Sequence, residues 1–360
     1  MVTSDFPHSR STIGGGLAMF HWIRALSRNH QIYLVSFLRN EDRIGLEQMK
    51  AYCRRIRTVP AQRRPIEKLR SLLLLPRHPF PVASTYSKRI PFLINELISR
   101  EGIDLVQFNH LHLGQYIKKT AGSVKKVIFF PDIVSNVRRQ QVRISSGFKK
   151  YFYYREWKVS RYWEKWYAIW AGNVFILSSK DKRMVESWDI GVRTAVLPLL
   201  VDQSLFRIDR NHILPESILF IGALHRQVNI DALEVLKRTI IPAVRREHPG
   251  ARCLVVGANP PKKVIGMDSE DFPIQGRVEK IEPYFQKAAL LAVPLRVAGG
   301  IIIKIVQAMA AGVPVVATRT ANAGIGAREN EEILVADKPE DFARKISWLL
   351  KDPKQAERIG

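Results

Sequence analysis

The chain has 360 residues, 46% hydrophobic and 25% charged, which is too long for one ordinary hydrophobic core and predicts two globular domains. The net charge is +24, and residues 1–205 carry most of it, with 34 Lys and Arg against 15 Asp and Glu. This half is therefore expected to bind an anionic partner: a membrane leaflet, a lipid-linked phosphate or a nucleic acid. The two cysteines are too few for a disulfide framework and fit a reducing cytoplasm. No run of about 18 uncharged apolar residues is present, so no transmembrane helix is predicted.

Short apolar segments alternate with helical segments through the first half of the chain. The opening MVTSDFP is interpreted as the end of a buried strand and the loop after it, with most of that strand missing. Residues 14–16, all glycine, are expected to form a loop ahead of a helix at 17–29. Further strands are predicted at 31–37, 103–108, 126–130 and 175–178, an alternation typical of a parallel, doubly wound sheet.

The alternation restarts after a strand-and-turn passage expected at 197–206. Strands are predicted at 218–222, 252–257, 272–276, 290–294, 313–317 and 332–335, and helices at 229–247, 281–289, 304–311 and 339–350. The sequence thus predicts an α/β protein with two Rossmann-like domains: residues 1–200, with a truncated first strand, and 201–360, with a truncated final helix. Because ligands of open α/β sheets bind at the carboxyl ends of the strands, a site is expected in a cleft between the domains.

The strongest functional signal is the stretch from 294 to 316, PLRVAGGIIIKIVQAMAAGVPVV. A Gly-Gly pair precedes a helix that opens with Lys304, and bare helical N–H groups beside a cation are typical of a phosphate site. The alternative is a solvated helix lysine, which fits poorly with the isoleucines on both sides of Lys304. Arg226, just past the strand that ends at Gly222, is either a second cation on the phosphates or a surface arginine. Gln307 either hydrogen-bonds a ribose or is a partly buried helix glutamine.

Polar residues also follow the predicted strands of the first half. The glycines at 14–16 either let backbone N–H groups approach a phosphate or sugar, or form only a flexible turn. His110 and His112 follow the strand at 103–108 and are candidates for substrate contact. Their spacing also suits a metal pair, but no acidic or cysteine partner accompanies them, so no metal site is predicted. Asp132 follows the next strand and either faces the same site or caps a helix.

Residues 138–170 combine cations with aromatic rings. Nine Lys and Arg accompany two Glu, and they are interleaved with four tryptophans and several tyrosines. This mixture suits a membrane interface, where rings lie at headgroup depth and cations meet anionic lipid. It also suits single-stranded nucleic acid. A helix pair with aromatic core contacts and a solvated basic face would account for many of these rings.

Taken together, these segments resemble a family 4 glycosyltransferase of the GT-B fold, and within that family the bacterial polysaccharide-type sugar transferases. The matching segments run through nearly the whole chain and include RALSRNHQIYLVSF, ILFIGALHRQVNIDAL, QGRVEKIEPYFQKAALLAVPLR and GGIIIKIVQAMAAGVPVVAT. The resemblance implies that a hexose moves, with retention and without a metal, from a UDP- or GDP-linked donor to a lipid-linked or polysaccharide acceptor. It also implies no cofactor beyond the donor. The basic first domain is expected to dock at the inner face of a membrane, near that acceptor, which makes the protein cytoplasmic and peripheral.

The same resemblance implies roles for single residues. Arg226 and Lys304 would hold the diphosphate and stabilise charge on the leaving group, and His110 would join them in catalysis. Gln307 would replace the family's ribose-binding glutamate. The remaining implied contacts are Gly15 and Gly16 under the donor phosphates and acceptor, Gly222, Gly300 and Ile301 against the donor, and His112 and Asp132 on the acceptor side.

Several positions depart from the family pattern. The E-x7-E carboxylates of the family read Gly299 and Gln307, and the Asn-Gly of the passage between the domains reads Leu199-Leu200. These departures leave open a degenerate, non-catalytic relative that binds a sugar nucleotide or another subunit. An epimerase, which can share the GT-B fold, also stays open. The charge alone would allow a nucleic-acid-binding protein, but no nucleic-acid motif accompanies it, so no nucleic acid is expected as a partner.

Overall fold

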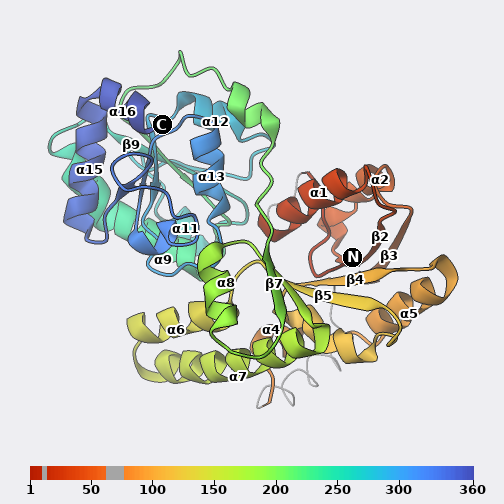
Figure 1. The fold of residues 1–360 in the computed structure, drawn as a ribbon. Coiled ribbons are helices and arrows are strands. Elements are labelled where there is room, and N and C mark those ends of the chain that lie inside the picture. The colour runs from red at the N-terminus through yellow and green to blue at the C-terminus, as the bar shows by residue number, and fades with distance from the viewer. Residues whose placement is uncertain (10–13, 62–76) are drawn as a thin grey trace. The chain divides into compact units, whose positions relative to one another are not determined.

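The computed structural model describes residues 1–9, 14–61 and 77–360. The chain divides into two compact units, Met1–Leu200 and Val201–Gly360. Each unit is built around one parallel sheet with helices packed on it (Figure 1). We refer to them as the first and the second unit.

The first unit contains a seven-stranded sheet in the order β3-β2-β1-β4-β5-β6-β7, in which all neighbours are parallel. The strands predicted at 31–37, 103–108, 126–130 and 175–178 are confirmed with small shifts of their ends, whereas β3 and β7 were missed by the sequence analysis. The strands are β1 Val2–Thr3, β2 Tyr33–Leu38, β3 Arg55–Pro60, β4 Leu105–Asn109, β5 Lys125–Phe130, β6 Asn173–Ile176 and β7 Arg193–Val196.

Helices connect these strands and cover the sheet. Alternate side chains of a strand point to opposite faces. On β2, Val35 and Phe37 therefore join the core on one face of the sheet, while Leu34 joins a smaller core on the other. The described helices are α1 Gly14–Leu26, η1 Asn40–Asp42, α2 Gly45–Lys50, α4 Phe80–Ser84, α5 Arg89–Glu101, η2 Leu111–Lys119, α6 Val134–Ile144, α7 Gly147–Ala171 and α8 Ser179–Glu186.

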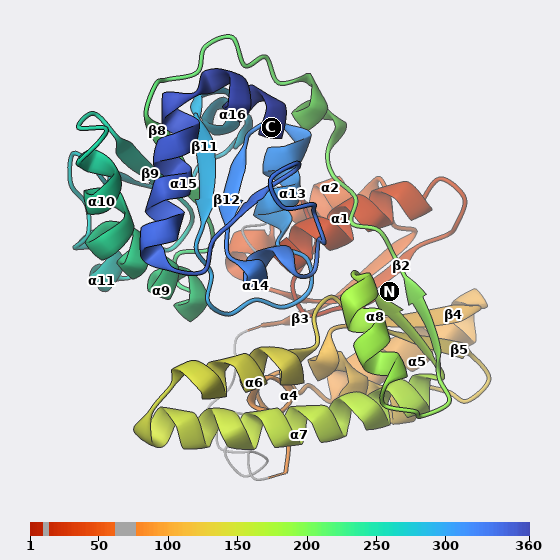
Figure 2. The ribbon, with the colours of Figure 1, turned by 60° about the vertical axis from the view of Figure 1, so that its left-hand side comes forward.

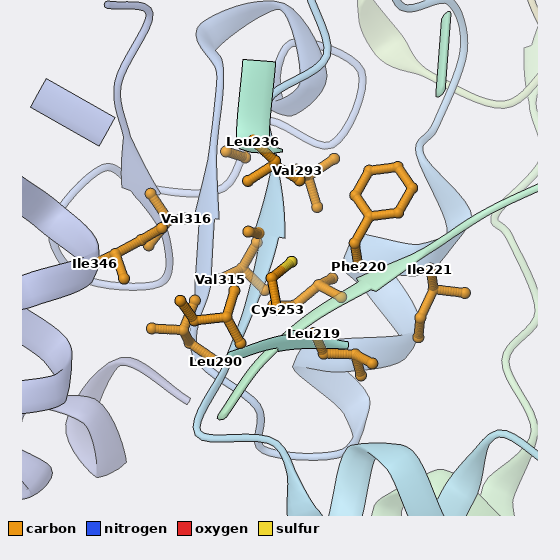
Figure 3. Close-up of a cluster of buried hydrophobic side chains, with 14 of the residues drawn as sticks. Leu219, Phe220, Ile221, Leu236, Cys253, Leu290, Val293, Val315, Val316 and Ile346 are labelled. Atoms are coloured by element: carbon orange, nitrogen blue, oxygen red, sulfur yellow. The ribbon is translucent and has the colours of Figure 1, made fainter. Parts of the chain in front are cut away.

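The second unit contains a six-stranded parallel sheet in the order β10-β9-β8-β11-β12-β13. Its strands are apolar along most of their length because both faces are buried. Figure 3 shows part of this core, where side chains from several neighbouring strands pack together. The six predicted strands are all confirmed: β8 Ser217–Ile221, β9 Arg252–Val256, β10 Ile274–Gly276, β11 Leu290–Val293, β12 Val315–Ala317 and β13 Leu334–Val335.

The helices of the second unit follow the predicted alternation with one exception. The helix predicted at 229–247 is not continuous, because a π-helical turn, Leu236–Ile240, separates α9 from α10. Pro242 lies in the first turn of α10, and its missing N–H interrupts the regular hydrogen-bond ladder there. Most of these helices are labelled in Figure 2, and α12 is labelled in Figure 1. They are η3 Gln203–Arg207, α9 Gln227–Val235, α10 Ile241–Arg245, α11 Lys262–Ile265, α12 Glu282–Lys287, α13 Ile303–Ala310, α14 Arg319–Asn322, α15 Pro339–Lys351 and α16 Pro353–Ile359.

Two further expectations are corrected by the structure. Residues 14–16 are not a loop, because they form the first turn of α1. The passage at 197–206 contains no strand, because β7 ends at Val196 and only one further ladder bond follows, from the N–H of Leu197 to the oxygen of Ile176. Pro198 then has no N–H with which to continue the ladder.

No helix in the described ranges has both the length and the apolar composition needed to cross a lipid bilayer. Both cysteines, Cys53 and Cys253, are free thiols buried in the cores.

Replacement of Gly114 by alanine should destabilise the first unit. A Cβ at this position of η2 would lie 2.3 Å from Cδ2 of Tyr167, whose ring is fully buried. The overpacked Gly114→Ala variant should therefore lose about 1–3 kcal/mol in urea unfolding. Gly122→Ala is the matched control, because nothing lies within 4 Å of its added Cβ. Equal stabilities of the two variants would contradict the packing described here.

Candidate functional site

Two glycines bring the carboxyl ends of β8 and β9 into close contact. Gly222 follows β8 and Gly257 follows β9. A Cβ built on Gly257 would lie 1.7 Å from the carbonyl oxygen of Gly222, so no side chain fits at 257 without a backbone shift. The N–H of Gly222 donates to the oxygen of Val256 at 3.0 Å, which fixes the register of this close approach.

The ammonium group of Lys304 lies beside Gly222. A Cβ on Gly222 would be 2.9 Å from Lys304 Nζ and 2.8 Å from Asn229 Nδ2. Lys304 Nζ donates a hydrogen bond to Asn229 Oδ1 at 3.2 Å and lies 4.3 Å from the centre of the Phe220 ring. Asn229 Nδ2 donates to the oxygen of Ala223 at 2.9 Å, so its amide is oriented with the oxygen toward Lys304.

The charge of Lys304 has no acidic partner in this arrangement. Burial, together with the nearby guanidinium of Arg226, lowers the pKa of Lys304 to about 7. Among the described residues no carboxylate forms an ion pair with Lys304, and the two acidic residues of α9 pair elsewhere, Asp231 with Arg296 and Glu234 with Lys263. Two cations held close together without a counter-ion form a site for an anion, because the anion removes the cost of burying the charge.

The same site lies at the start of a helix. Lys304 is the second residue of α13, whose N-cap residue is Ile302, a side chain that cannot accept a hydrogen bond. The first N–H groups of a helix have no partners within it and favour anions. Gly300 turns the chain just before this helix with a φ of 60°, and a Cβ on Gly324 would lie 1.8 Å from its carbonyl oxygen. The approach to α13 is therefore built from closely packed backbone.

The sheet order places these residues at one point of the fold. Winding of the sheet reverses between β8 and β11, which lie side by side although they are far apart in sequence. Gly222 and Arg226 follow β8, and Lys304 follows β11. Such a reversal point is where open α/β sheets bind ligands. The structure thus brings together three of the residues singled out from the sequence.

The other predicted donor contacts lie on the same connection. Gly300 and Ile301 belong to the segment between β11 and α13, and Gln307 lies one helical turn after Lys304 on α13, where it is half-buried. Their contacts with a donor stay predictions, as do the donor contacts of Gly15 and Gly16.

A similar reversal occurs in the first unit, between β1 and β4. α1 follows β1, and His110 follows β4 with an unusual φ of 77°. A Cβ on Gly15 would lie 3.0 Å from His110 Nε2, so the first turn of α1 packs against this imidazole. The rings of His110 and His112 stack with their centres 5.4 Å apart. The structure therefore groups Gly15, His110 and His112, and Gly16, the residue after Gly15, is buried.

Burial, together with the neighbouring His110, lowers the pKa of His112 to about 3, so its imidazole stays neutral at physiological pH. Asp132 follows β5, the neighbour of β4. Burial raises the pKa of the Glu164 carboxyl to about 8, and the nearby Asp132 adds to this rise. Within the described residues no three His, Cys, Asp or Glu side chains are grouped closely enough to hold a metal ion. The acceptor roles proposed for these residues remain predictions.

A surface hollow of about 710 Å³ lies elsewhere in the second unit, beside β13 and α15. Three of its four cations lie near acidic residues: Arg319 near Asp337, Arg344 near Asp341 and Lys345 near Glu329. Most of its positive charge is therefore paired, unlike that of Lys304.

The sequence of the second unit matches a known family. Residues 215–352 match the model described as "Glycosyl transferases group 1". This segment is similar to the group 1 glycosyltransferases. It contains all of the residues around Lys304, from Phe220 to α13. No curated protein sequence matches the chain at a significant level.

Solved structures show that the whole chain has the fold of the GT-B glycosyltransferases, with two Rossmann-like units. Sucrose-phosphate synthase from Thermosynechococcus elongatus is similar with a TM-score of 0.73 and 16% identity, over 99% of this chain and 91% of that one. Anabaena HepE in complex with UDP-glucose has a TM-score of 0.66 and 14% identity, over 99% and 92%. A glycosyltransferase from Rickettsia africae has a TM-score of 0.62 and 13% identity, over 99% and 90%.

Sequence reasoning missed two residues that surround Lys304. Asn229 and Phe220 contact the ammonium group directly. Phe220 looks like any other apolar residue of β8, and Asn229 looks like a surface residue of a helix. The only signal in the sequence was the position of Asn229 itself, a polar residue on the side of the helix that carries Ala232 and Leu233.

Replacement of Asn229 by aspartate should move the titration of Lys304. A carboxylate within hydrogen-bond distance of the ammonium favours its charged form, so the pKa of Lys304 should rise from about 7. The measurement is an NMR titration of lysine ε-carbons in labelled protein, with Lys304→Met used to assign the signal. An unchanged midpoint in Asn229→Asp would contradict the contact.

Proposed function

We propose that this protein is a glycosyltransferase that moves a hexose from a UDP- or GDP-linked sugar to a lipid-linked or polysaccharide acceptor, with retention and without a metal ion. The observation that carries the proposal is the partly buried Lys304 ammonium, which lies near Arg226 and has no carboxylate partner among the described residues. A diphosphate supplies the missing negative charge. The group 1 glycosyltransferase match and the GT-B fold support this assignment.

The chemistry of the site suits a diphosphate leaving group. When the bond between the sugar and the diphosphate breaks, negative charge grows on the phosphate oxygens. Lys304 and Arg226 are fixed cations aimed at that charge, and the open N-terminus of α13 adds N–H donors. These groups supply positive charge of the kind that a metal ion supplies in other transferases, which supports the metal-independent reaction.

The nucleoside part of the donor would extend along α13. Gln307, one turn after Lys304, presents an amide that can hydrogen-bond a ribose hydroxyl. A uridine nucleotide is the first choice to test, since Anabaena HepE has been described in complex with UDP-glucose. On the acceptor side, we assign His110, His112 and Asp132 to the binding of the acceptor hydroxyl, and we place the reaction at the cytoplasmic face of a membrane.

A second function is favoured by one observation. The family positions that hold two glutamates are occupied by Gly299 and Gln307, so the sugar would lose a carboxylate contact. A degenerate relative would bind the nucleotide sugar without transferring it. Release of UDP or GDP from a donor in the presence of bacterial lipid extract separates the two: release dependent on the extract supports transfer, and tight binding without release supports the degenerate relative.

Replacement of Lys304 by methionine should remove UDP binding and at the same time stabilise the second unit. The neutral side chain of similar length fills the space beside Phe220, and the cost of burying an unpaired charge disappears. Calorimetric titration should show a loss of affinity of about a hundredfold. Thermal unfolding should show a gain of about 1–2 kcal/mol.

A purely structural lysine would give the opposite pattern, with lower stability and unchanged nucleotide affinity. Lys351→Met is a suitable control, because Lys351 is an exposed lysine at the end of α15 in the same unit. Both its nucleotide affinity and its stability should match the parent protein. GDP is titrated beside UDP, so that the preferred nucleobase is found in the same series.

UDP affinity should fall as the pH rises above about 7. The free protein loses the Lys304 proton near this pH because its pKa is lowered to about 7. A bound diphosphate favours the charged ammonium and raises its pKa, so binding takes up a proton in the interval between the two values. Affinity should therefore fall by up to about tenfold per pH unit there. In Lys304→Met the residual affinity should show no such decline.

A further inference from the structure

The outward face of α7 is a continuous stripe of cations and aromatic rings. α7 has 25 residues and is about 37 Å long at 1.5 Å per residue. The side chains that point away from the core recur every three or four positions, as expected for one face of a helix. They are Tyr151, Tyr154, Lys158, Arg161, Tyr162, Lys165, Trp166 and Ile169, of which all but the half-buried Lys165 are exposed.

The acidic residues of α7 are absent from this stripe because both are used inside the unit. Glu156 is fully buried and accepts hydrogen bonds from the backbone N–H of Phe80 at 3.0 and 3.2 Å. Glu164 is fully buried and accepts from the N–H of Ser135 at 3.1 Å. The two carboxylates therefore hold the N-terminal ends of α4 and α6, and the solvent side of α7 has only positive charge.

The aromatic residues of α7 divide into two groups. Tyr167 is fully buried, and Trp163 and Trp170 pack beside it against the core of the first unit. These rings form the aromatic core contacts that the sequence analysis gave as an alternative to membrane binding. Tyr151 and Tyr162, in contrast, are 71% and 56% exposed, and no core contact explains them.

We propose that the outward face of α7 binds the surface of an anionic phospholipid bilayer, with the helix axis in the plane of the membrane. The stripe pairs cations with amphipathic rings, the combination that lies at headgroup depth. None of the ion pairs among the described residues uses Lys158, Arg161 or Lys165, so no carboxylate there neutralises their charge. α6 lies beside α7 in both views and ends in Ile144, which is 47% exposed (Figures 1 and 2).

Shape favours a bilayer over single-stranded nucleic acid. One side of α7 packs on its unit, and the other presents a line of exposed side chains that matches a flat surface. Single-stranded nucleic acid is instead bound in grooves with free ring faces. On α7 the protein's own cations occupy such faces: Lys158 Nζ lies 4.7 Å from the Trp157 ring centre, and Lys118 Nζ lies 4.1 Å from that of Trp170. The exposed rings that remain lie along one line.

The test is sedimentation of the full chain with vesicles of phosphatidylcholine, with and without phosphatidylglycerol. The protein should bind only the vesicles that contain phosphatidylglycerol, and salt should weaken the binding. The triple variant Lys158→Gln, Arg161→Gln, Lys165→Gln should lose about a hundredfold in affinity, since each cation near an anionic surface contributes about fivefold. The triple variant Lys88→Gln, Lys125→Gln, Arg193→Gln removes the same charge from exposed sites outside α7 and should retain most of the binding.

Equal losses in the two triple variants would overturn the proposal, because binding would then follow total charge and not α7. Failure of the parent protein to bind anionic vesicles would overturn it as well. So would an oligonucleotide that binds more tightly than the vesicles and loses its affinity in the α7 variant, since the stripe would then be a nucleic-acid site.

The depth to which the aromatic rings enter the bilayer is a second measurement, and it does not depend on the charge of the protein alone. Lipids with a spin label near the headgroup should quench tryptophan fluorescence in the bound state, and Trp166→Phe should reduce this quenching. Tyr151→Ser combined with Tyr162→Ser should weaken vesicle binding while leaving its salt dependence unchanged, because the rings contribute apolar contact. Unchanged affinity in this double variant would show that no ring enters the interface and would contradict the proposed orientation.

The inference does not depend on the chemistry at Lys304. Lys304→Met should bind vesicles like the parent protein, and the α7 charge variant should bind UDP like the parent protein. Failure of nucleotide binding would therefore leave the membrane proposal standing, and failure of vesicle binding would leave the donor site standing.

Discussion

The arrangement of the second unit around the carboxyl ends of β8 and β9 depends on one ammonium group, Lys304, that has no acidic partner among the described residues. Lys304 can lie beside Gly222 only because that residue has no Cβ, and β8 and β9 can come together beneath it only because Gly257 has none. Asn229 then fixes the direction of the ammonium with a neutral oxygen, which orients the charge without cancelling it. The residues around the lysine are those that leave its charge available to a ligand.

The two units use the same architecture for different surfaces. In each, a parallel sheet reverses its winding between two central strands, and small or polar residues follow the strands at that point. In the second unit the residues at this point are cations, Lys304 and Arg226. In the first unit they are imidazoles: His110 packs against Gly15 and stacks on His112. This difference in chemistry is consistent with one unit binding a diphosphate and the other an uncharged hydroxyl.

Much of this organisation is predictable from the sequence, because buried parallel strands are nearly continuous apolar runs and the Gly-Gly-helix pattern around Lys304 is compact. The misses have local causes. β3 reads RIRTVP, where cations interrupt the apolar run, and β7 has only four residues. The contact between Asn229 and Lys304 joins residues 75 positions apart, so spacing could not reveal it. The sequence also did not reveal that Glu156 and Glu164 point into the core, because composition counts charges without showing the direction of the side chains.

The two buried glutamates of α7 also bear on the order in which the first unit can form. The N-cap residue of α6 is Ile133 and that of α4 is Pro79, and neither offers a side-chain acceptor to the N–H groups of its own helix. Glu164 and Glu156 supply those acceptors from 29 and 76 residues further along the chain. During synthesis from the N-terminus, both helix ends remain incomplete until α7 has been made. This side of the unit can therefore acquire its full set of hydrogen bonds only after α7 has left the ribosome.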